Sequence, residues 1–125
     1  IIFLLGGIIM MIDTHCHLDI EDYEDVEEVI HHMDGNYMIA SGASPEGNKR
    51  VLELVEKYPN IYGTIGLHPE CASTYTKDDL LFVEENLNHP KIVGIGEIGL
   101  DYHYPDIERK TKRVIYKTNQ TRSKI

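Results

Sequence analysis

Blocks of apolar and polar residues alternate along the chain and predict four strands that take turns with three helices. Compact apolar runs, typical of buried strands, occupy residues 10–14, 37–40, 61–67 and 92–98. Segments with apolar residues on one helical face lie between them, at residues 23–33, 44–58 and 76–88. This alternation favours an α/β fold whose parallel sheet has right-handed crossovers and is buried on both faces.

Capping and helix-breaking residues set the predicted helix boundaries. Ser44 is expected to cap the second helix, with Pro45 in its first turn, and Thr76 is expected to cap the third. Pro59 ends the second helix and Pro90 follows the third, because proline cannot continue a helix.

Polar clusters follow all four predicted strands. They are residues 13–17, 41–44, 66–69 and 96–102. In parallel α/β architectures, active residues lie where strands end and loops begin. We therefore expect the functional residues to lie in these four segments.

His15 and His17 are candidate metal ligands. Residues i and i+2 at a strand end point to the same side, about 6 to 7 Å apart along the strand. Two imidazoles placed in this way suit bidentate capture of a transition metal. The alternative is a pair of solvent-exposed loop histidines. Asp13 either binds the metal as well or orients one of the imidazoles.

Glu97 is the third candidate ligand, because a carboxylate inside an apolar strand is costly unless it is paired or bound to a metal. The alternative is a buried glutamate that is bonded to the backbone or to an arginine. Residues 92–108 contain no lysine or arginine, so a local ion pair is disfavoured. A metal ligand that bridges two ions is the preferred interpretation.

Three further side chains near these segments have two interpretations each. His68 either orients a substrate phosphate or lies near the metals, and the alternative is a loop histidine stacked on Pro69. Asp101 contacts substrate or holds the glutamate loop, and the alternative is a helix-initiating turn. Cys16 points away from His15 and His17 and is expected to pack rather than to take part in catalysis.

The composition is that of one globular domain, with 125 residues, 42% hydrophobic and 26% charged. A net charge of −9 excludes nucleic-acid binding by a broad basic surface, so contact with phosphate requires another attraction, such as a bound metal. Seven of the 12 basic residues lie from Arg109 onward, which indicates a boundary or a solvated basic tail. Two cysteines without a paired spacing fit a reducing compartment and favour the cytoplasm.

Three motifs together resemble the TatD-like metal-dependent deoxyribonuclease family. They are MIDTHCHLD at residues 11–19, GLHP at residues 66–69 and GEIGLDY at residues 96–102. The resemblance implies a (β/α)8 TIM-type barrel of the amidohydrolase-like kind, which hydrolyses phosphodiester bonds of DNA. It also implies two divalent metal ions, with His15 and His17 as the histidine pair of the first metal and Glu97 as the bridging glutamate.

The implied ions are Zn, Mn, Co or Mg, which suit imidazole and carboxylate ligands in different degrees. Two bridged cations neutralise phosphate charge, lower the pKa of a bound water and steady the leaving oxygen. An acidic protein would then hold DNA through its metal-bound phosphate. We predict no membrane association and no obligate protein partner.

The chain departs from the family in length. Family members are roughly twice as long, and their later strands supply two further histidines and an aspartate. Here no histidine follows His103 and no acid follows Glu108. Residues 10–113 are therefore expected to form about the first four β/α units, a half barrel that is inactive alone. The alternatives are a non-catalytic remnant with weak metal binding and another amidohydrolase-like enzyme acting on a cyclic amide or a phosphoester.

The two ends of the chain differ from the rest. Residues 1–9 lack the basic region of a secretory signal, and the apolar run is too short for a bilayer span, which needs about 20 residues. We expect them to be translated upstream sequence, with Met10 or Met11 as the true start. Residues 114–125 have poor apolar spacing, and we expect a frameshift near Arg113. The alternatives are a genuine short gene and a shifted stop in a decayed copy.

Overall fold

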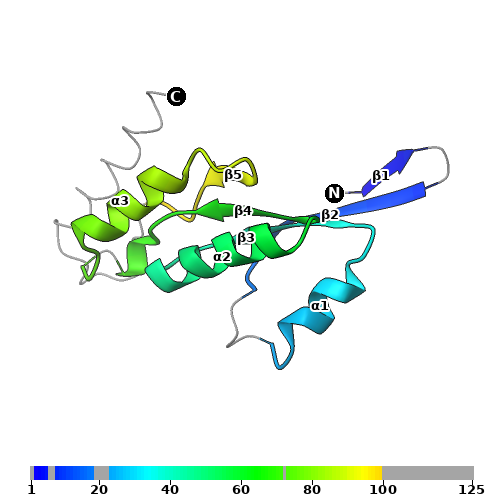
Figure 1. Ribbon diagram of the computed structural model, residues 1–125, viewed down its shortest axis with the longest axis horizontal. Helices are drawn as coiled ribbons and strands as arrows, with labels where there is room; N and C mark the ends of the chain where they lie inside the picture. Colours follow the sequence, from blue (N-terminus) through cyan, green and yellow to red (C-terminus); the bar gives the residue numbers. More distant parts are fainter. Residues whose placement is uncertain (1, 6–7, 19–22, 72, 100–125) are drawn as a thin grey trace.

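The computed structural model describes residues 2–5, 8–18, 23–71 and 73–99. It contains a five-stranded sheet in the order β1-β2-β3-β4-β5, with the helices packed along it (Figure 1). The strands are β1 (Ile2–Leu5), β2 (Ile8–Cys16), β3 (Tyr37–Ser41), β4 (Ile61–Ile65) and β5 (Ile92–Ile95). The helices are α1 (Val26–His32), α2 (Pro45–Lys57) and α3 (Lys77–Asn86), with a 3-10 turn, η1 (Pro69–Cys71).

Strands β2 to β5 are parallel, which confirms the predicted parallel sheet. Its predicted burial on both faces is wrong, since no residue of β5 is fully buried and Val93 is 52% exposed. Neighbours in the sheet are also neighbours in the sequence, and a helix connects each parallel pair. β3 and β4 pair without a shift, and Ala40 lies opposite Gly63. The parallel order brings the carboxyl ends of β2, β3, β4 and β5 to one edge, where the predicted polar clusters meet.

Two of the predicted helix caps are confirmed. The Ser44 hydroxyl accepts a hydrogen bond from the Gly47 amide, and Pro45 occupies the first turn of α2. Thr76 and Asp79 form a reciprocal capping box at the start of α3. These caps satisfy amides that the first turn of a helix leaves without a partner.

α1 begins at Val26, three positions later than predicted. The carboxylate of Asp25 accepts hydrogen bonds from the amides of Glu27 and Glu28, so Asp25 is the N-cap. The prediction from Tyr23 relied on apolar spacing and overlooked this cap. An aspartate before an apolar helical pattern is itself a start signal.

Two predicted strands are shorter in the structure, since β4 ends at Ile65 and β5 at Ile95. The chain then leaves the β5 direction, because the amide of Gly96 bonds to the carbonyl of Ile65 and the amide of Glu97 bonds to the carbonyl of Gly42. The placement of Glu97 inside an apolar strand is therefore wrong. Glu97 follows the strand and crosses the end of β4 towards β3.

The amino-terminal segment forms a strand that the sequence patterns did not predict. β1 pairs antiparallel with β2, with Ile2 opposite Met11 and Leu5 opposite Ile8. It therefore covers the start of the outer edge of β2. The origin of residues 1–9 as upstream sequence stays a prediction, and Asp101 and the tail at residues 114–125 lie outside the described residues.

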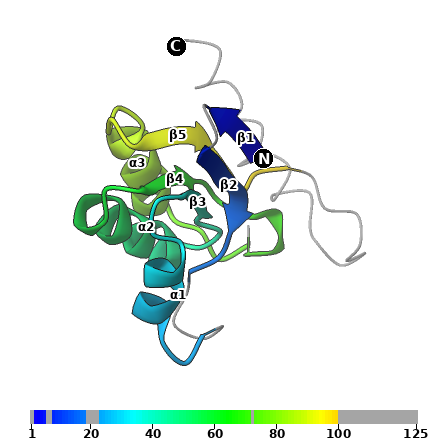
Figure 2. The same cartoon turned by 90° about the vertical axis from the view of Figure 1, so that its right-hand side faces the viewer.

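The three helices lie on one side of the sheet and enclose the core (Figure 2). Leu54 and Val55 of α2 pack with Ile61 and Ile65 of β4, and each of the four is at most 1% exposed. Burial of one such side chain contributes about 1.5 to 3 kcal/mol. This layer fixes the strands whose carboxyl ends carry the polar side chains. Within the described residues, no helix is both long and apolar enough to cross a membrane.

Candidate metal centre

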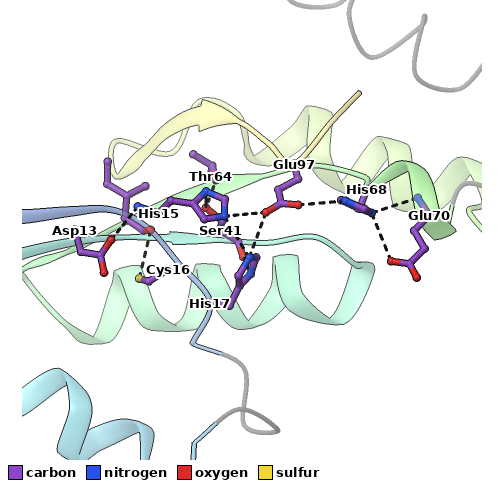
Figure 3. A network of polar contacts seen from close by, with 10 residues as sticks. Asp13, His15, Cys16, His17, Ser41, Thr64, His68, Glu70 and Glu97 are labelled. Atoms are coloured by element: carbon purple, nitrogen blue, oxygen red, sulfur yellow. Dashed lines mark hydrogen bonds and ion pairs between the residues drawn. The ribbon is translucent and has the colours of Figure 1, made fainter. Parts of the chain in front are cut away.

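Three predicted ligands, His15, His17 and Glu97, meet at the carboxyl edge of the sheet (Figure 3). The Nε2 atoms of the two histidines are 3.3 Å apart. Glu97 Oε1 lies 2.9 Å from Nε2 of His15 and 3.2 Å from Nε2 of His17. All three donor atoms therefore face one point.

Strand geometry brings the two histidines to this point. Glu97 reaches it because the chain after β5 crosses the end of β4 towards β3. His15 is the penultimate residue of β2, and His17 directly follows the strand. The two side chains, at positions i and i+2, lie on the same side as predicted. Glu97 arrives from the far side of the sheet, because its amide is anchored on Gly42 at the end of β3. Backbone hydrogen bonds thus carry the segment after β5 past β4 to the end of β3, and the Glu97 side chain covers the remaining distance to the histidines of β2.

Gly66 makes this crossing sterically possible. A Cβ atom at Gly66 would lie 2.6 Å from the carbonyl carbon of Gly96 and 2.7 Å from the carbonyl oxygen of Glu97. Any side chain at Gly66 would push the backbone of Gly96 and Glu97 away from the histidines. The backbone of Gly66 is itself fixed by the buried amide of Asn48, which donates to the Gly66 carbonyl at 2.7 Å and accepts from its N–H at 3.1 Å.

Ser41 contacts both imidazoles from the end of β3. The carbonyl of Ser41 lies 3.1 Å from Nδ1 of His17, and the hydroxyl lies 3.2 Å from Nδ1 of His15. The sequence placed Ser41 in a polar cluster but did not identify it as a site residue. A hydroxyl side chain at a strand end beside the His-x-His strand was the signal that could have found it.

His68 lies on the opposite side of Glu97. The Glu70 amide donates to Nδ1 of His68 at 3.2 Å, so the neutral imidazole carries its hydrogen on Nε2. That Nε2 is 3.4 Å from Glu97 Oε2. His68 is therefore close to the candidate centre, and its role towards substrate stays a prediction.

Asp13 and Cys16 do not join the cluster of donor atoms. Asp13 Oδ1 accepts from the backbone N–H of His15 at 3.1 Å and so shapes the strand end. Cys16 packs against the core, as predicted, and its Sγ donates to the carbonyl of Ile39. Burial, reinforced by the Asp13 carboxylate, raises the pKa of the Cys16 thiol to about 12. The thiol is therefore protonated at neutral pH and is a poor ligand or nucleophile.

The donor set fits a divalent transition metal. Bonds of about 2.0 to 2.1 Å to a tetrahedral ion place neighbouring ligand atoms about 3.3 Å apart. The three separations in the structure are 2.9, 3.2 and 3.3 Å. Two imidazoles and one carboxylate are also the ligand types of catalytic rather than structural zinc sites. Three protein ligands leave coordination positions for water or substrate.

Comparison with known proteins agrees with this geometry. The family model for TatD related DNase matches residues 12–120. The chain belongs to the TatD-related DNase family. The match includes all three candidate ligands, and the described part of this TatD-related chain carries them at the carboxyl edge of its sheet.

Several curated relatives have names that match this family. YabD of Bacillus subtilis, an uncharacterized metal-dependent hydrolase, is 36% identical over 112 residues, which are 86% of this chain and 44% of the relative. YjjV of Escherichia coli, named in the same way, is 33% identical over 96 residues, which are 72% of this chain and 37% of the relative. The 3'-5' ssDNA/RNA exonuclease TatD of Musicola paradisiaca is 37% identical over 67 residues, which are 53% of this chain and 25% of the relative.

A solved structure shows the same fold. The crystal structure of YjjV, a TatD homologue from Escherichia coli, matches with a TM-score of 0.70 and 28% identity, over 87% of this chain and 45% of that chain. The TatD-related chain spans less than half the length of the relatives it matches. Its four parallel strands and alternating helices correspond to about half of a (β/α)8 barrel, as predicted.

Proposed function

We propose that this TatD-related chain binds a divalent metal ion through His15, His17 and Glu97, as part of a hydrolase that cleaves phosphodiester bonds of DNA. The observation that carries the proposal is the convergence of the three donor atoms, with separations of 2.9 to 3.3 Å. Glu97 Oε1 faces the histidines and Oε2 lies on the side of His68, so Oε2 would remain available as a ligand for a second ion.

When bound, the ions would supply Lewis acidity, charge neutralisation at phosphate and a water of lowered pKa. The chain's own residues hold the donors in place. Ser41 contacts the Nδ1 atoms of His15 and His17, and both Nε2 atoms face Oε1 of Glu97. The Nε2 atom of His68 lies 3.4 Å from Oε2 of Glu97, and in the bound complex its N–H would donate to a substrate phosphate oxygen instead.

The proposed substrate is DNA held by its phosphate. A cavity of about 470 Å³ adjoins Glu97 and is lined by His68, Pro69 and residues 95–99. It is large enough for part of a nucleotide, and bound cations would attract the polyanion despite the net charge of −9. The exonuclease name of one relative supports this choice of substrate. Two cysteines without a paired spacing support a cytoplasmic location.

The second candidate is a non-catalytic remnant that binds metal weakly. The described residues offer a single cluster of three donors, His15, His17 and Glu97. On either candidate we expect metal binding by this chain, and the two candidates differ in whether the bound metal supports cleavage of single-stranded DNA.

The test titrates the full chain with Co²⁺, Zn²⁺ and Mn²⁺ and assays end-labelled single-stranded DNA with each metal. His15→Ala removes one ligand, and we expect it to abolish measurable Co²⁺ binding. His32→Ala is the matched control, because His32 is exposed on α1, away from the site. Chelation with EDTA should remove any activity of the wild-type chain.

The outcomes separate the candidates. Cleavage that disappears in His15→Ala and persists in His32→Ala supports the hydrolase. Weak metal binding without turnover supports the remnant. Absence of metal binding by the folded wild-type chain would refute both, because each requires His15, His17 and Glu97 to act as ligands.

A further inference from the structure

Ser41 holds two different histidines by two different groups. It ends β3, between β2 and β4, and is 3% exposed. Its backbone carbonyl meets His17 at 3.1 Å and its side-chain hydroxyl meets His15 at 3.2 Å, both at Nδ1 (Figure 3). One buried residue therefore faces the inner nitrogen of both candidate metal ligands.

The carbonyl contact fixes the tautomer of His17. A carbonyl oxygen only accepts hydrogen bonds, so Nδ1 of a neutral His17 must carry the hydrogen. The lone pair on Nε2 of His17 is then free, and this atom lies 3.2 Å from Oε1 of Glu97. That is the form in which an imidazole binds a metal.

The hydroxyl contact to His15 is anchored from a third strand. Thr64 on β4 donates its hydroxyl hydrogen to Ser41 Oγ at 3.2 Å. The Ser41 oxygen can still accept from Nδ1 of His15, which leaves Nε2 of His15 available. The polar chain therefore runs from β4 through β3 to β2 on the face opposite the helices.

We propose that Ser41 is a positioning residue of the metal centre, whose carbonyl sets the tautomer of His17 and whose Thr64-anchored hydroxyl orients His15. The inference rests on the proposed function, since the two histidines are ligands of the proposed metal centre. It predicts that the two histidines respond differently to substitution of Ser41. Removal of the hydroxyl affects His15 and leaves His17 unchanged, because the backbone carbonyl survives every substitution at Ser41.

The experiment uses the full chain and two readouts. The first is Co²⁺ and Zn²⁺ affinity by calorimetry, and the second is the imidazole ¹⁵N shifts of the metal-free protein, which report each tautomer directly. The variants are Ser41→Ala, Ser41→Thr and Thr64→Val. Ser44→Ala is the matched control, because it removes an equivalent hydroxyl, which caps α2 and is bonded to Gly47 rather than to a histidine.

We expect Ser41→Ala to lower metal affinity about 10- to 100-fold, the usual effect of removing a group that orients a ligand. In the metal-free protein its His15 tautomer ratio changes, and His17 keeps its hydrogen on Nδ1. Ser41→Thr restores both properties because it restores the hydroxyl. Thr64→Val gives a smaller change in His15 alone. Ser44→Ala lowers the melting temperature and leaves affinity and both tautomers unchanged.

The inference is overturned if Ser41→Ala keeps wild-type affinity and His15 shifts, or if Ser44→Ala loses as much affinity as Ser41→Ala. Should Ser41→Ala not fold, Thr64→Val decides the matter, since it must alter His15 without altering His17. If the wild type binds no metal, the proposed function fails. The ¹⁵N shifts then still decide whether Ser41 holds the two imidazoles as described.

Discussion

The two faces of the sheet differ sharply, although they belong to the same strands. On the helix-covered face, Ile61 and Ile65 of β4 are fully buried against α2. On the opposite face of that strand, Thr64 carries the polar chain that leads to Ser41 and His15. Successive side chains of a strand point to opposite sides. One strand can therefore supply stability on one face and chemistry on the other.

The faces are joined at Asn48, which is 1% exposed. It belongs to α2 on the packed side, yet its side chain bonds to both the carbonyl and the N–H of Gly66, over which residues 96–97 cross. The difference between the two faces therefore predicts two kinds of mutational effect. Substitutions in the core change stability alone, whereas those at Asn48 or Gly66 change both stability and metal binding.

Leu54→Ala gives the largest expected loss of stability, about 2 to 5 kcal/mol, because it opens a cavity in the core beneath β4. Urea unfolding at neutral pH measures it. Leu81→Ala, at a residue that is 49% exposed on α3, should cost under about 0.5 kcal/mol. Metal affinity, measured where Leu54→Ala is still folded, should equal that of the wild type. If Leu54→Ala also lowered metal affinity, the helix-covered face would not act on stability alone.

Asn48→Ala is expected to cost about 1 to 3 kcal/mol, because it leaves buried groups of Gly66 without partners. Unlike Leu54→Ala, it should also weaken Co²⁺ binding, since Gly66 supports the Glu97 crossing. Asn86→Ala serves as the control, because among the described residues that side chain bonds within α3, to the Phe82 carbonyl. Unchanged Co²⁺ affinity in folded Asn48→Ala would show that α2 does not support the site.

Gly66→Ala should destabilise the protein by about 1 to 3 kcal/mol, the usual cost of overpacking. The new Cβ would collide with the backbone of Gly96 and Glu97. Its larger consequence is a loss of metal affinity, as the carboxylate moves away from the histidines. Gly94→Ala is milder, because its Cβ would meet only a Thr64 methyl at 3.3 Å. Equal Co²⁺ affinities for the two variants would contradict the steric argument.

Thr76→Ala is expected to cost less than the substitutions at Leu54, Asn48 and Gly66, about 1 kcal/mol at pH 7, with no change in metal binding. Hydrogen bonds from the Thr76 amide and hydroxyl lower the pKa of Asp79. A carboxyl whose pKa is lower in the folded state stabilises at neutral pH, and this contribution is lost as the pH falls below about 4. Urea unfolding should therefore give a penalty for Thr76→Ala that shrinks at pH 3. A constant penalty would rule out this role for Asp79.

Local features of the fold could be predicted because they depend on residues close in sequence. The caps at Ser44 and Thr76 are bonds over three positions, and the His15 and His17 pair follows from strand periodicity. The alternation of strands and helices, together with the three motifs, was enough to predict the parallel sheet. The start of α1 was wrong by three residues, because the pattern was given more weight than Asp25.

Other features depended on contacts between distant segments. Periodicity extended β5 through Glu97, whereas hydrogen bonds to Ile65 and Gly42 draw the chain across β4. The pairing of β1 with β2 was also absent from the prediction, because a short apolar run does not specify a partner. Ser41 became a site residue only when parallel pairing placed β3 beside β2.

The sequence alone therefore determined the order of the four parallel strands and three helices, the edge of the sheet where polar groups gather and the identity of the three candidate ligands. The tertiary structure decided how those ligands meet. Glu97 reaches the histidines because Gly66 has no side chain and because backbone bonds anchor the crossing on β3 and β4. Such contacts depend on close packing between segments far apart in the chain, which no local pattern encodes.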